Sequence, residues 1–194
     1  MTDTTLHPNV VPHDHPLGRR VGVVGHGGKT TLARAIARKM DLEFIELDWI
    51  ANLPGWVRRP KDEFRQIVDE RMSANPNGWV TDHYHSEVRD MIFERADSLV
   101  VLHLPFRMMM WRRTKRSLKR AWTGEKVCGG NVETFRTHLL SRDSAILEMW
   151  QKRYRYRKIS ETIARQARPD VDLYVIRSGK ELNRFYKIHG LERN

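Results

Sequence analysis

Cysteine is nearly absent from this chain, which has only Cys128 among its 194 residues. A single thiol excludes an internal disulfide bond and a cysteine-based metal cluster. Long hydrophobic runs are also lacking, and none reaches the length that a membrane-spanning helix needs. We therefore expect a protein that is not embedded in a membrane and that resides in a reducing compartment, for which the cytoplasm is the simplest choice.

Acidic residues are scarce relative to basic ones. The chain has 24 Asp and Glu against 35 Lys and Arg, which gives a formal net charge of +11. Such a surface attracts nucleic acid, acidic lipid or nucleotide phosphates, and arginine clusters also line phosphoryl-transfer sites. The densest basic run, Lys152–Lys158, is either a nucleic-acid surface with two interleaved tyrosines for stacking or the basic end of a helix.

Length and pattern predict one domain. Residues 1–18 carry histidines and prolines without a periodic apolar pattern, so we expect a flexible tail. Residues 19–194 show no internal repeat and no dividing linker, which favours a single domain with a mobile excursion, a lid, at about 121–142. Apolar runs predict strands at 21–24, 44–48, 79–82, 99–104 and 172–177.

Helical periodicity predicts helices at 30–40, from Pro60 to about Met72, and at 86–95, 106–120 and 143–158. A last helix opens with a capping box, Ser178 and Glu181, and its expected buried face is Leu182, Phe185 and Ile188. Strands that alternate with helices form βαβ units, so the expected sheet is parallel with right-handed crossovers.

The stretch Val21–Leu32 reads as a buried strand, a glycine turn, a lysine and two threonines that open a helix. Backbone N–H groups in such a turn surround phosphate oxygens, and the helix N-terminus favours the same negative charge. The turn is two residues shorter than the P-loop spacing Gly-x-x-x-x-Gly-Lys. We predict that the nucleotide phosphates are bound by Gly25, His26, Gly27, Gly28, Lys29, Thr30 and Thr31.

Side chains around this turn suggest separate roles. Lys29 is the predicted phosphate clamp and a catalytic residue, and the hydroxyl of Thr30 is a predicted Mg²⁺ ligand. Asp82, at the end of a central strand, is the second predicted metal ligand, or alternatively a cap on the next helix. Ligands of open parallel sheets bind beyond the carboxyl ends of the strands. We therefore predict that the phosphate acceptor is bound by Asp48, Trp49 and Arg58, a segment that reads equally well as a packed loop.

Two arginines on one helix are further catalytic candidates. Arg112 and Arg116 are four residues apart and share a helix face, and their forked donors suit phosphate oxygens. The helix is basic all round, so a solvated face is the alternative. Three histidines, His83, His85 and His103, match no zinc spacing, and we interpret them as ordinary polar or capping residues.

Taken together, these pieces resemble the P-loop nucleotide kinases, in particular the adenylate kinase-related proteins labelled as DNA topology modulation proteins. The resemblance runs from about Arg20 to Lys158 and rests on Gly-Lys-Thr-Thr-Leu-Ala at 28–33, Glu-Leu-Asp at 46–48, Pro-Gly-Trp at 54–56, Trp-Val-Thr-Asp at 79–82, Arg-Ala-Asp at 95–97, Leu-Pro at 104–105, Trp-Arg-Arg at 111–113 and Gly-Asn at 130–131. The family's Asp-Gly-Asn-Tyr appears here as Asp82-His83-Tyr84-His85, and the family's acid near the end of the fourth strand is His103.

The resemblance implies a three-layer α/β/α fold with a five-stranded parallel sheet, a nucleotide donor and an acceptor under a lid. It also implies that Arg112 and Arg116 contact phosphate. We therefore predict an ATP-dependent phosphotransferase that uses ATP and Mg²⁺ and acts on a nucleotide or another small acceptor. Two alternatives remain: a nucleotide-binding protein with lost or altered catalysis, suggested by the short turn and the altered 82–85 segment, and a basic nucleic-acid-binding protein.

Overall fold

The computed structural model describes residues 7–83, 85–123, 126–127, 131–132 and 158–193. Its longer elements are β1 (Arg20–Gly25), α1 (Lys29–Met40), β2 (Glu43–Ile45), α2 (Leu47–Ala51), α3 (Lys61–Ala74), β5 (Trp79–His83), α4 (Arg89–Arg95), β6 (Ser98–Leu102), α5 (Phe106–Thr123), α9 (Ile159–Gln166), β9 (Asp172–Ile176) and α10 (Gly179–Ile188). The short elements are β3 (Asn52–Leu53), η1 (Pro54–Trp56), β4 (Val57–Arg58), η2 (Ser86–Val88), β7 (Lys126–Val127) and β8 (Asn131–Val132).

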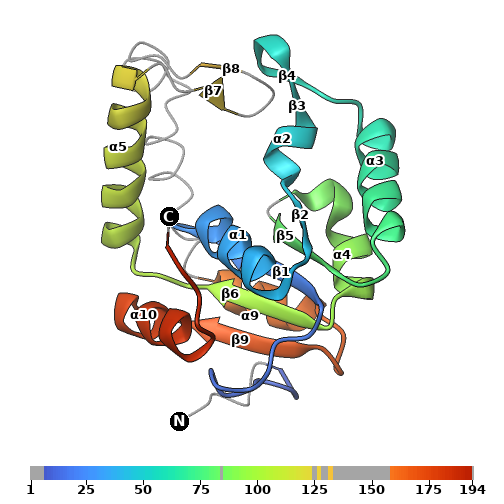
Figure 1. Ribbon diagram of the computed structural model, residues 1–194, viewed down its shortest axis with the longest axis vertical. Helices are drawn as coiled ribbons and strands as arrows, with labels where there is room; N and C mark the ends of the chain where they lie inside the picture. Colours follow the sequence, from blue (N-terminus) through green and yellow to red (C-terminus); the bar gives the residue numbers. More distant parts are fainter. Residues whose placement is uncertain (1–6, 84, 124–125, 128–130, 133–157, 194) are drawn as a thin grey trace.

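Five parallel strands form the central sheet, in the order β2-β5-β1-β6-β9. β1 lies in the middle, with Val23 beside Asp82 of β5 on one side and beside Val100 of β6 on the other. Each of these five strands is followed by a helix, which returns the chain to the end of the sheet where the strands begin (Figure 1). The predicted α/β class with a five-stranded parallel sheet is confirmed.

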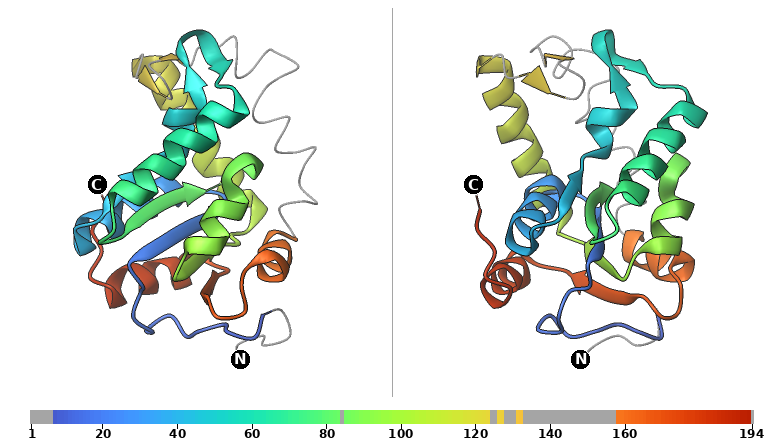
Figure 2. Two further views of the ribbon diagram at one scale, coloured as in Figure 1. Left: turned by 90° about the vertical axis from the view of Figure 1, so that its right-hand side faces the viewer. Right: turned by 45° about the vertical axis from the view of Figure 1, so that its right-hand side comes forward.

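Helices cover both faces of the sheet, and the strand residues alternate between two hydrophobic clusters. One cluster joins Val23, Val100 and Tyr174 to α1, α5 and α10, and the other joins Val101 and Val175 to α3, α4 and α9. Figure 2 shows the sheet between these two helix layers. This three-layer arrangement is the one expected for apolar strands that are buried on both faces.

The last helix begins as its capping box predicts. Ser178 Oγ accepts a hydrogen bond from the backbone N–H of Glu181 at 3.1 Å, and Glu181 Oε2 accepts one from the N–H of Arg177 at 2.8 Å. Of its expected buried face, Leu182 and Phe185 are buried, but Ile188 is 39% exposed. Tyr186 takes the place of Ile188 in the core, because it packs in the same cluster as Phe185.

The second strand is shorter than predicted, and this changes the position of Asp48. β2 ends at Ile45, and the N–H groups of Trp49 and Ile50 bond to the carbonyl of Glu46, which starts α2. The backbone N–H of Leu47 donates to Asp82 Oδ1 at 3.3 Å and so ties this turn to β5. Asp48 therefore lies in the first turn of a short helix and not at the end of a strand.

Residues 7–17 are not the flexible tail that their composition predicts. Val10 pairs with Leu173 next to the edge strand β9, and Val11 is buried in the core. The Nε2 atom of His7 lies 2.9 Å from the carbonyl oxygen of Arg168. Because β9 is the last strand of the sheet, its outer edge presents unpaired backbone groups, and residues 7–17 cover part of it.

The expected lid region is described only in part. α5 continues to Thr123, three residues past its predicted end, and a short antiparallel pair, β7 and β8, follows. β8 lies next to η1. Figure 1 shows α5 and the segment from α2 to β4 extending beyond the sheet, one to either side of α1. The predicted helix at 143–158 lies outside the described residues, apart from Lys158. Helix α9 begins just after it, at Ile159, and the sequence patterns did not predict it.

Candidate functional site: the glycine turn and its neighbours

The glycine turn between β1 and α1 adopts a conformation that only glycine tolerates well. Gly25, Gly27 and Gly28 have φ angles of 106°, 82° and 138°. A Cβ on Gly25 would lie 2.2 Å from the carbonyl oxygen of Leu102, so the turn passes directly over the end of β6. The N–H of His26 donates to that same oxygen at 3.4 Å. The turn is therefore held close against the sheet at the carboxyl ends of two central strands.

Lys29 is the first residue of α1, where the helix dipole disfavours a cation. No acidic residue lies in the first turn of this helix to offset the charge. The nearest carboxylates come from other elements: burial acts to raise the pKa of both Asp48 and Asp82, and the charge of Lys29 opposes that rise in each. Lys29 thus begins a helix directly after a glycine turn, and its role as a phosphate clamp stays a prediction.

Thr30 and Asp82 form a side-chain hydrogen bond at the turn. The hydroxyl of Thr30 donates to Asp82 Oδ2 at 2.6 Å, and Asp82 is 1% exposed. Burial raises the pKa of Asp82, while the charge of Lys29 and the Thr30 hydrogen bond oppose the rise. Hydroxyl and carboxylate oxygens are ligands that Mg²⁺ prefers, so this donor set fits the metal. Asp82 does not cap the next helix among the described contacts, since its bonds go to Thr30 and Leu47.

A second carboxylate lies across from the turn and is paired with a histidine. Asp48 Oδ1 is 2.8 Å from the Nε2 atom of His85, and the Nδ1 atom of His85 is 3.4 Å from Arg58 Nη2. Burial tends to raise the pKa of Asp48, but the His85 hydrogen bond and the charge of Lys29 prevail and hold it at about 2. Asp48 is therefore a carboxylate at neutral pH. The structure thus brings together two of the three predicted acceptor residues, Asp48 and Arg58.

The third predicted acceptor residue, Trp49, is 51% exposed on α2 and makes none of the contacts just described. His85 is the residue that sequence reasoning missed, because it matched no metal motif and was interpreted as an ordinary polar residue. Its only local signal is its place three residues after Asp82, just past the carboxyl end of β5. Among the described residues, no group of three or more His, Cys, Asp or Glu is arranged to hold a metal ion.

Helix α5 contacts the glycine turn through one of its two candidate arginines. Arg112 Nη1 donates to the carbonyl oxygen of Gly27 at 2.8 Å and lies 3.5 Å from the point where a Cβ on Gly28 would be. Arg116 is on the same helix one turn further from the sheet and is exposed. Arg112 therefore lies at the turn, whereas the contact of Arg116 with phosphate stays a prediction.

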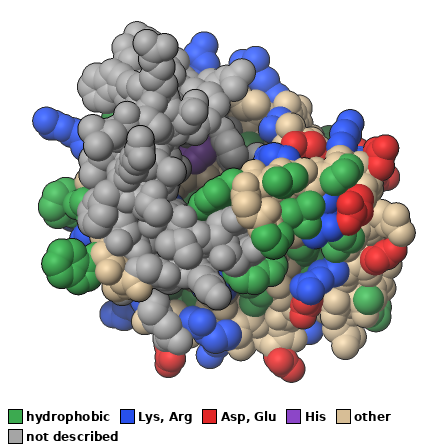
Figure 3. Space-filling view, turned by 90° about the horizontal axis from the view of Figure 1, so that it is seen from above, with side chains coloured by type: hydrophobic (Ala, Val, Ile, Leu, Met, Phe, Trp, Pro, Cys, Tyr) green, Lys and Arg blue, Asp and Glu red, His purple; other side chains and the backbone are tan. Residues whose placement is uncertain are grey.

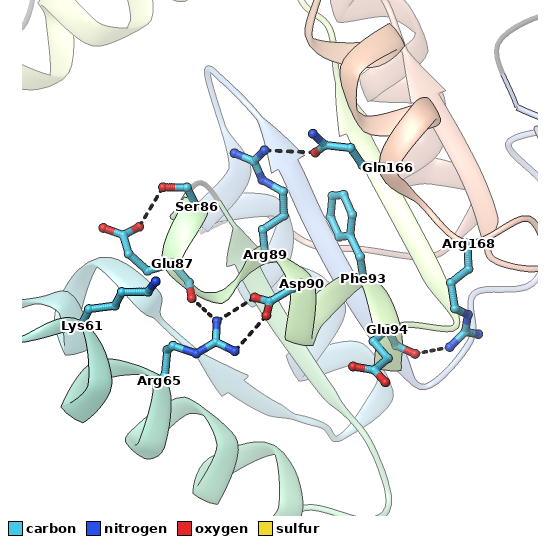
Figure 4. Close-up of a pocket in the computed structure, with 10 residues that line it drawn as sticks. All are labelled: Lys61, Arg65, Ser86, Glu87, Arg89, Asp90, Phe93, Glu94, Gln166 and Arg168. Atoms are coloured by element: carbon cyan, nitrogen blue, oxygen red, sulfur yellow. Dashed lines mark hydrogen bonds and ion pairs between the residues drawn. The ribbon is translucent and has the colours of Figure 1, made fainter.

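A cavity of about 580 Å³ lies away from this turn, between α3, α4 and the end of α9. Figure 4 shows the residues that line it, and none of the predicted site residues is among them. Two of its arginines are hydrogen-bonded within the wall, since Arg65 forms two hydrogen bonds to Asp90 and Arg89 donates to the amide oxygen of Gln166. We therefore locate the candidate site at the glycine turn and not in this cavity.

No protein-family model matches the chain, and no curated protein sequence matches it. Among solved structures, a gluconokinase from Sinorhizobium meliloti 1021 is similar at 17% identity, with 88% of each chain covered and a TM-score of 0.47. A shikimate kinase from Bacteroides thetaiotaomicron is 17% identical, with 89% of this chain and 98% of that chain covered and a TM-score of 0.48. A sugar kinase from Janibacter sp. HTCC2649 is 18% identical, with 90% and 91% covered and a TM-score of 0.47.

These similarities support no conclusion about activity or substrate. The function proposed below rests on the geometry of the turn. The resemblance to the adenylate kinase-related family stays a prediction. None of the described helices has both the length and the apolar character that crossing a membrane requires.

Proposed function

We propose that the protein is an ATP-dependent phosphotransferase that transfers a phosphoryl group to a nucleotide or another small acceptor. The observation that carries this proposal is the hydrogen bond from Thr30, at the start of α1, to the buried carboxylate of Asp82. A hydroxyl and a carboxylate at the start of the helix that follows such a turn are suited to hold Mg²⁺ against bound phosphates. One Asp82 oxygen also accepts the backbone N–H of Leu47, so the metal role is proposed for the side that bonds Thr30.

The donor side of the proposed site consists of the turn, Lys29 and Arg112. Backbone N–H groups within residues 25–31, other than that of His26, which donates to Leu102, bind phosphate oxygens, and Lys29 neutralises the outer phosphates. Thr30 and Asp82 would hold Mg²⁺, which would neutralise charge on the phosphates. Arg112 is already at the turn, and Arg116 joins it on the same helix to stabilise charge on the transferred group.

The acceptor side consists of Asp48, Trp49 and Arg58. Asp48 is ionised at neutral pH, with its pKa lowered in part by the charge of Lys29, so it accepts a hydrogen bond from an acceptor hydroxyl. Arg58 and the exposed face of Trp49 offer a cation and an aromatic surface from the α2–β4 segment. The hairpin of β7 and β8 approaches this segment at η1, which is consistent with a cover over the acceptor.

Binding of ATP and Mg²⁺ is tested by thermal denaturation. A ligand at 100 times its dissociation constant stabilises the folded state by about 2.7 kcal/mol, which raises the melting temperature of a chain of this size by about 5–10 °C. Lys29→Met keeps the aliphatic stem and removes the charge, so we expect it to lose most of this rise. Lys39→Met, at the exposed end of the same helix, is the matched control and should keep it.

Transfer is tested by ADP formation and by phosphate incorporation into a panel of nucleosides, nucleotides and small alcohols. Transfer to a member of the panel supports the enzyme. Stabilisation by ATP without transfer to any of them favours instead a nucleotide-binding protein with lost catalysis, which the shortened turn makes a specific alternative. A wild-type protein with no nucleotide-dependent shift over a broad concentration range contradicts both.

The nucleic-acid alternative rested on Lys152–Lys158, of which only Lys158 lies within the described residues. On the face seen in Figure 3, the described Lys and Arg side chains are spread around the outline and interspersed with acidic ones. They do not gather into one basic patch there. Binding of single-stranded DNA or RNA with a steep salt dependence would revive this reading.

A further inference from the structure

The side chain of His85 is held in one orientation by packing and by both of its ring nitrogens. It is 7% exposed, and its ring packs edge-on against Phe64 of α3, with centroids 5.4 Å apart and an interplanar angle of 74°. Buried polar atoms require hydrogen-bond partners, and the two nitrogens find theirs in Asp48 and Arg58. Three elements, α2, α3 and β4, therefore determine where this imidazole points.

The hydrogen bond from Arg58 selects the tautomer of the ring. A guanidinium group only donates hydrogen bonds, so the Nδ1 atom of His85 must accept from Arg58 Nη2. The ring proton of the neutral imidazole then sits on Nε2, which donates to Asp48 Oδ1 at 2.8 Å. Arg58 is in turn within reach of Asn52 Oδ1 at 3.5 Å and of Glu87 at 3.9 Å. The hydrogen bonds thus run in one direction: Arg58 donates to His85, and His85 donates to Asp48.

This arrangement leaves Asp48 with one occupied and one open oxygen. Within the described part of the chain, Oδ1 takes the bond from His85 and no hydrogen bond goes to Oδ2. The Asp48 side chain is 42% exposed, whereas that of His85 behind it is nearly buried. The carboxylate is therefore fixed from its protein side and accessible from the other.

We propose that His85 is a positioning residue, which orients the Asp48 carboxylate so that Oδ2 accepts a hydrogen bond from the hydroxyl of the phosphate acceptor. This inference rests on the proposed function and adds a residue to it. In the transfer, the acceptor oxygen forms the new bond to the γ-phosphorus, and the bond from that phosphorus to the bridging oxygen breaks, with its electron pair leaving on ADP. The hydroxyl proton passes to the phosphate product or to water.

Asp48 does not keep that proton, because its pKa of about 2 makes it a weak base. Its contribution is orientation of the hydroxyl, and orientation depends on where the carboxylate is held. An error of about 1 Å in such a position costs on the order of 100-fold in rate. Release of Asp48 by removal of the His85 donor should therefore slow transfer by about 10- to 100-fold.

The tautomer is tested first, because its measurement needs no substrate. In wild-type protein labelled with ¹³C and ¹⁵N, the ring shifts of His85 at neutral pH should report the proton on Nε2. Arg58→Met removes the donor to Nδ1 and should shift the ring toward a mixture of tautomers. A wild-type ring with its proton on Nδ1 would overturn the proposed direction of the hydrogen bonds.

The kinetic test compares His85→Leu, which removes the donor, with His85→Gln, whose side-chain amide can donate to Asp48. ADP formation from Mg·ATP is measured with water as acceptor and then with the same panel of nucleosides, nucleotides and small alcohols. We expect His85→Leu to lower kcat by about 10- to 100-fold at an unchanged ATP-induced thermal shift, and His85→Gln to restore most of it. His7→Leu removes another buried histidine, far along the chain, and serves as the control for lost stability.

The outcomes separate the two proposals. No ATP-induced shift in the wild type overturns the proposed function, and the acceptor role of Asp48 with it. A wild type that transfers phosphate, with His85→Leu equally fast, overturns the role of His85 alone. A loss of activity that His85→Gln does not restore, or that His7→Leu reproduces, also overturns it, since a merely structural histidine would behave in that way.

Discussion

Gly25→Ala tests whether the phosphate turn is held rigidly against the sheet. Gly25 has a φ of 106°, and an alanine Cβ there would lie 2.2 Å from the carbonyl oxygen of Leu102 and 2.9 Å from its carbonyl carbon. Gly55 also has a positive φ, 76°, but a Cβ on it meets nothing within 4 Å. Gly55→Ala is therefore the matched control, which has the backbone strain without the collision.

The expected magnitudes follow from these contacts. A left-handed alanine costs about 1–2 kcal/mol, partly offset by the lower entropy of the unfolded chain, so Gly55→Ala should lose about 1 kcal/mol. In Gly25→Ala, β1 must also move about 1 Å from β6, which lengthens hydrogen bonds worth about 1 kcal/mol each beyond their normal range. We expect a loss of about 3–4 kcal/mol, because at least two such bonds are affected.

The assay is thermal unfolding followed by circular dichroism without nucleotide. For a chain of this size, 1 kcal/mol corresponds to about 2–4 °C, so Gly55→Ala should fall by about 2–4 °C and Gly25→Ala by about 10 °C. Gly25→Ala should also respond less to Mg·ATP, because loss of the bond from His26 to Leu102 displaces the rest of the turn, whose N–H groups are proposed to bind phosphate. Equal melting temperatures for the two variants would refute the claim that the turn is packed tightly on β6.

Three further predictions concern stability. Burial raises the pKa of Asp82 above its ordinary value of 3.8, so just above that pH the folded chain binds more protons than the unfolded chain. The free energy of unfolding therefore falls as the pH rises through this window. Asp82→Asn should accordingly melt at a higher temperature than wild type at pH 7, lose this advantage near pH 3.5, and respond less to Mg·ATP. Ser178→Ala should lose about 1 kcal/mol, or about 2–4 °C, because Ser178 Oγ caps the N–H of Glu181. Thr81→Val should be neutral or stabilising by up to about 1 kcal/mol, because the buried Oγ1 of Thr81 has no hydrogen-bond partner within the described residues.

Thermal melts across pH decide all three. If Asp82→Asn is less stable than wild type at pH 7 without ligand, the buried carboxylate stabilises the fold. Burial of its charge would then carry no free-energy cost that metal binding could offset. An unchanged Ser178→Ala would mean that the cap is redundant, and a loss of more than about 1 kcal/mol in Thr81→Val would reveal an unrecognised partner of the hydroxyl.

Much of the fold is predictable because it depends on local pattern. Strands that are apolar on both faces, such as Val21–Val24, fit only a sheet covered by two helix layers, and the structure has that sheet. The capping box at Ser178 identifies the start of α10 from two residues. The error at Asp48 arose because the run Phe44–Asp48 reads as a strand with an acid at its end, and only the bond from Leu47 to Asp82 shows where the chain turns.

Composition misled at the N-terminus for a related reason. Residues 7–17 have no periodicity of their own, and their order comes from the exposed edge of β9, which is a property of the sheet. Ile188 was misassigned because a helix stripe read from sequence does not say how far the opposing surface extends. In both cases the deciding surface is contributed by residues that are distant in the chain.

For the candidate site, the sequence alone determined the turn, because three glycines, a lysine and a threonine in that order encode a local conformation and a helix start. Only the tertiary structure decided which side chains lie near the turn. These are Asp82, which bonds Thr30, Arg112, which bonds Gly27, and the pair of His85 and Asp48, which are 37 residues apart. The physical reason is that these pairs depend on the order of strands in the sheet. Periodicity and capping act within a few residues, whereas strand order is settled by packing of the whole chain.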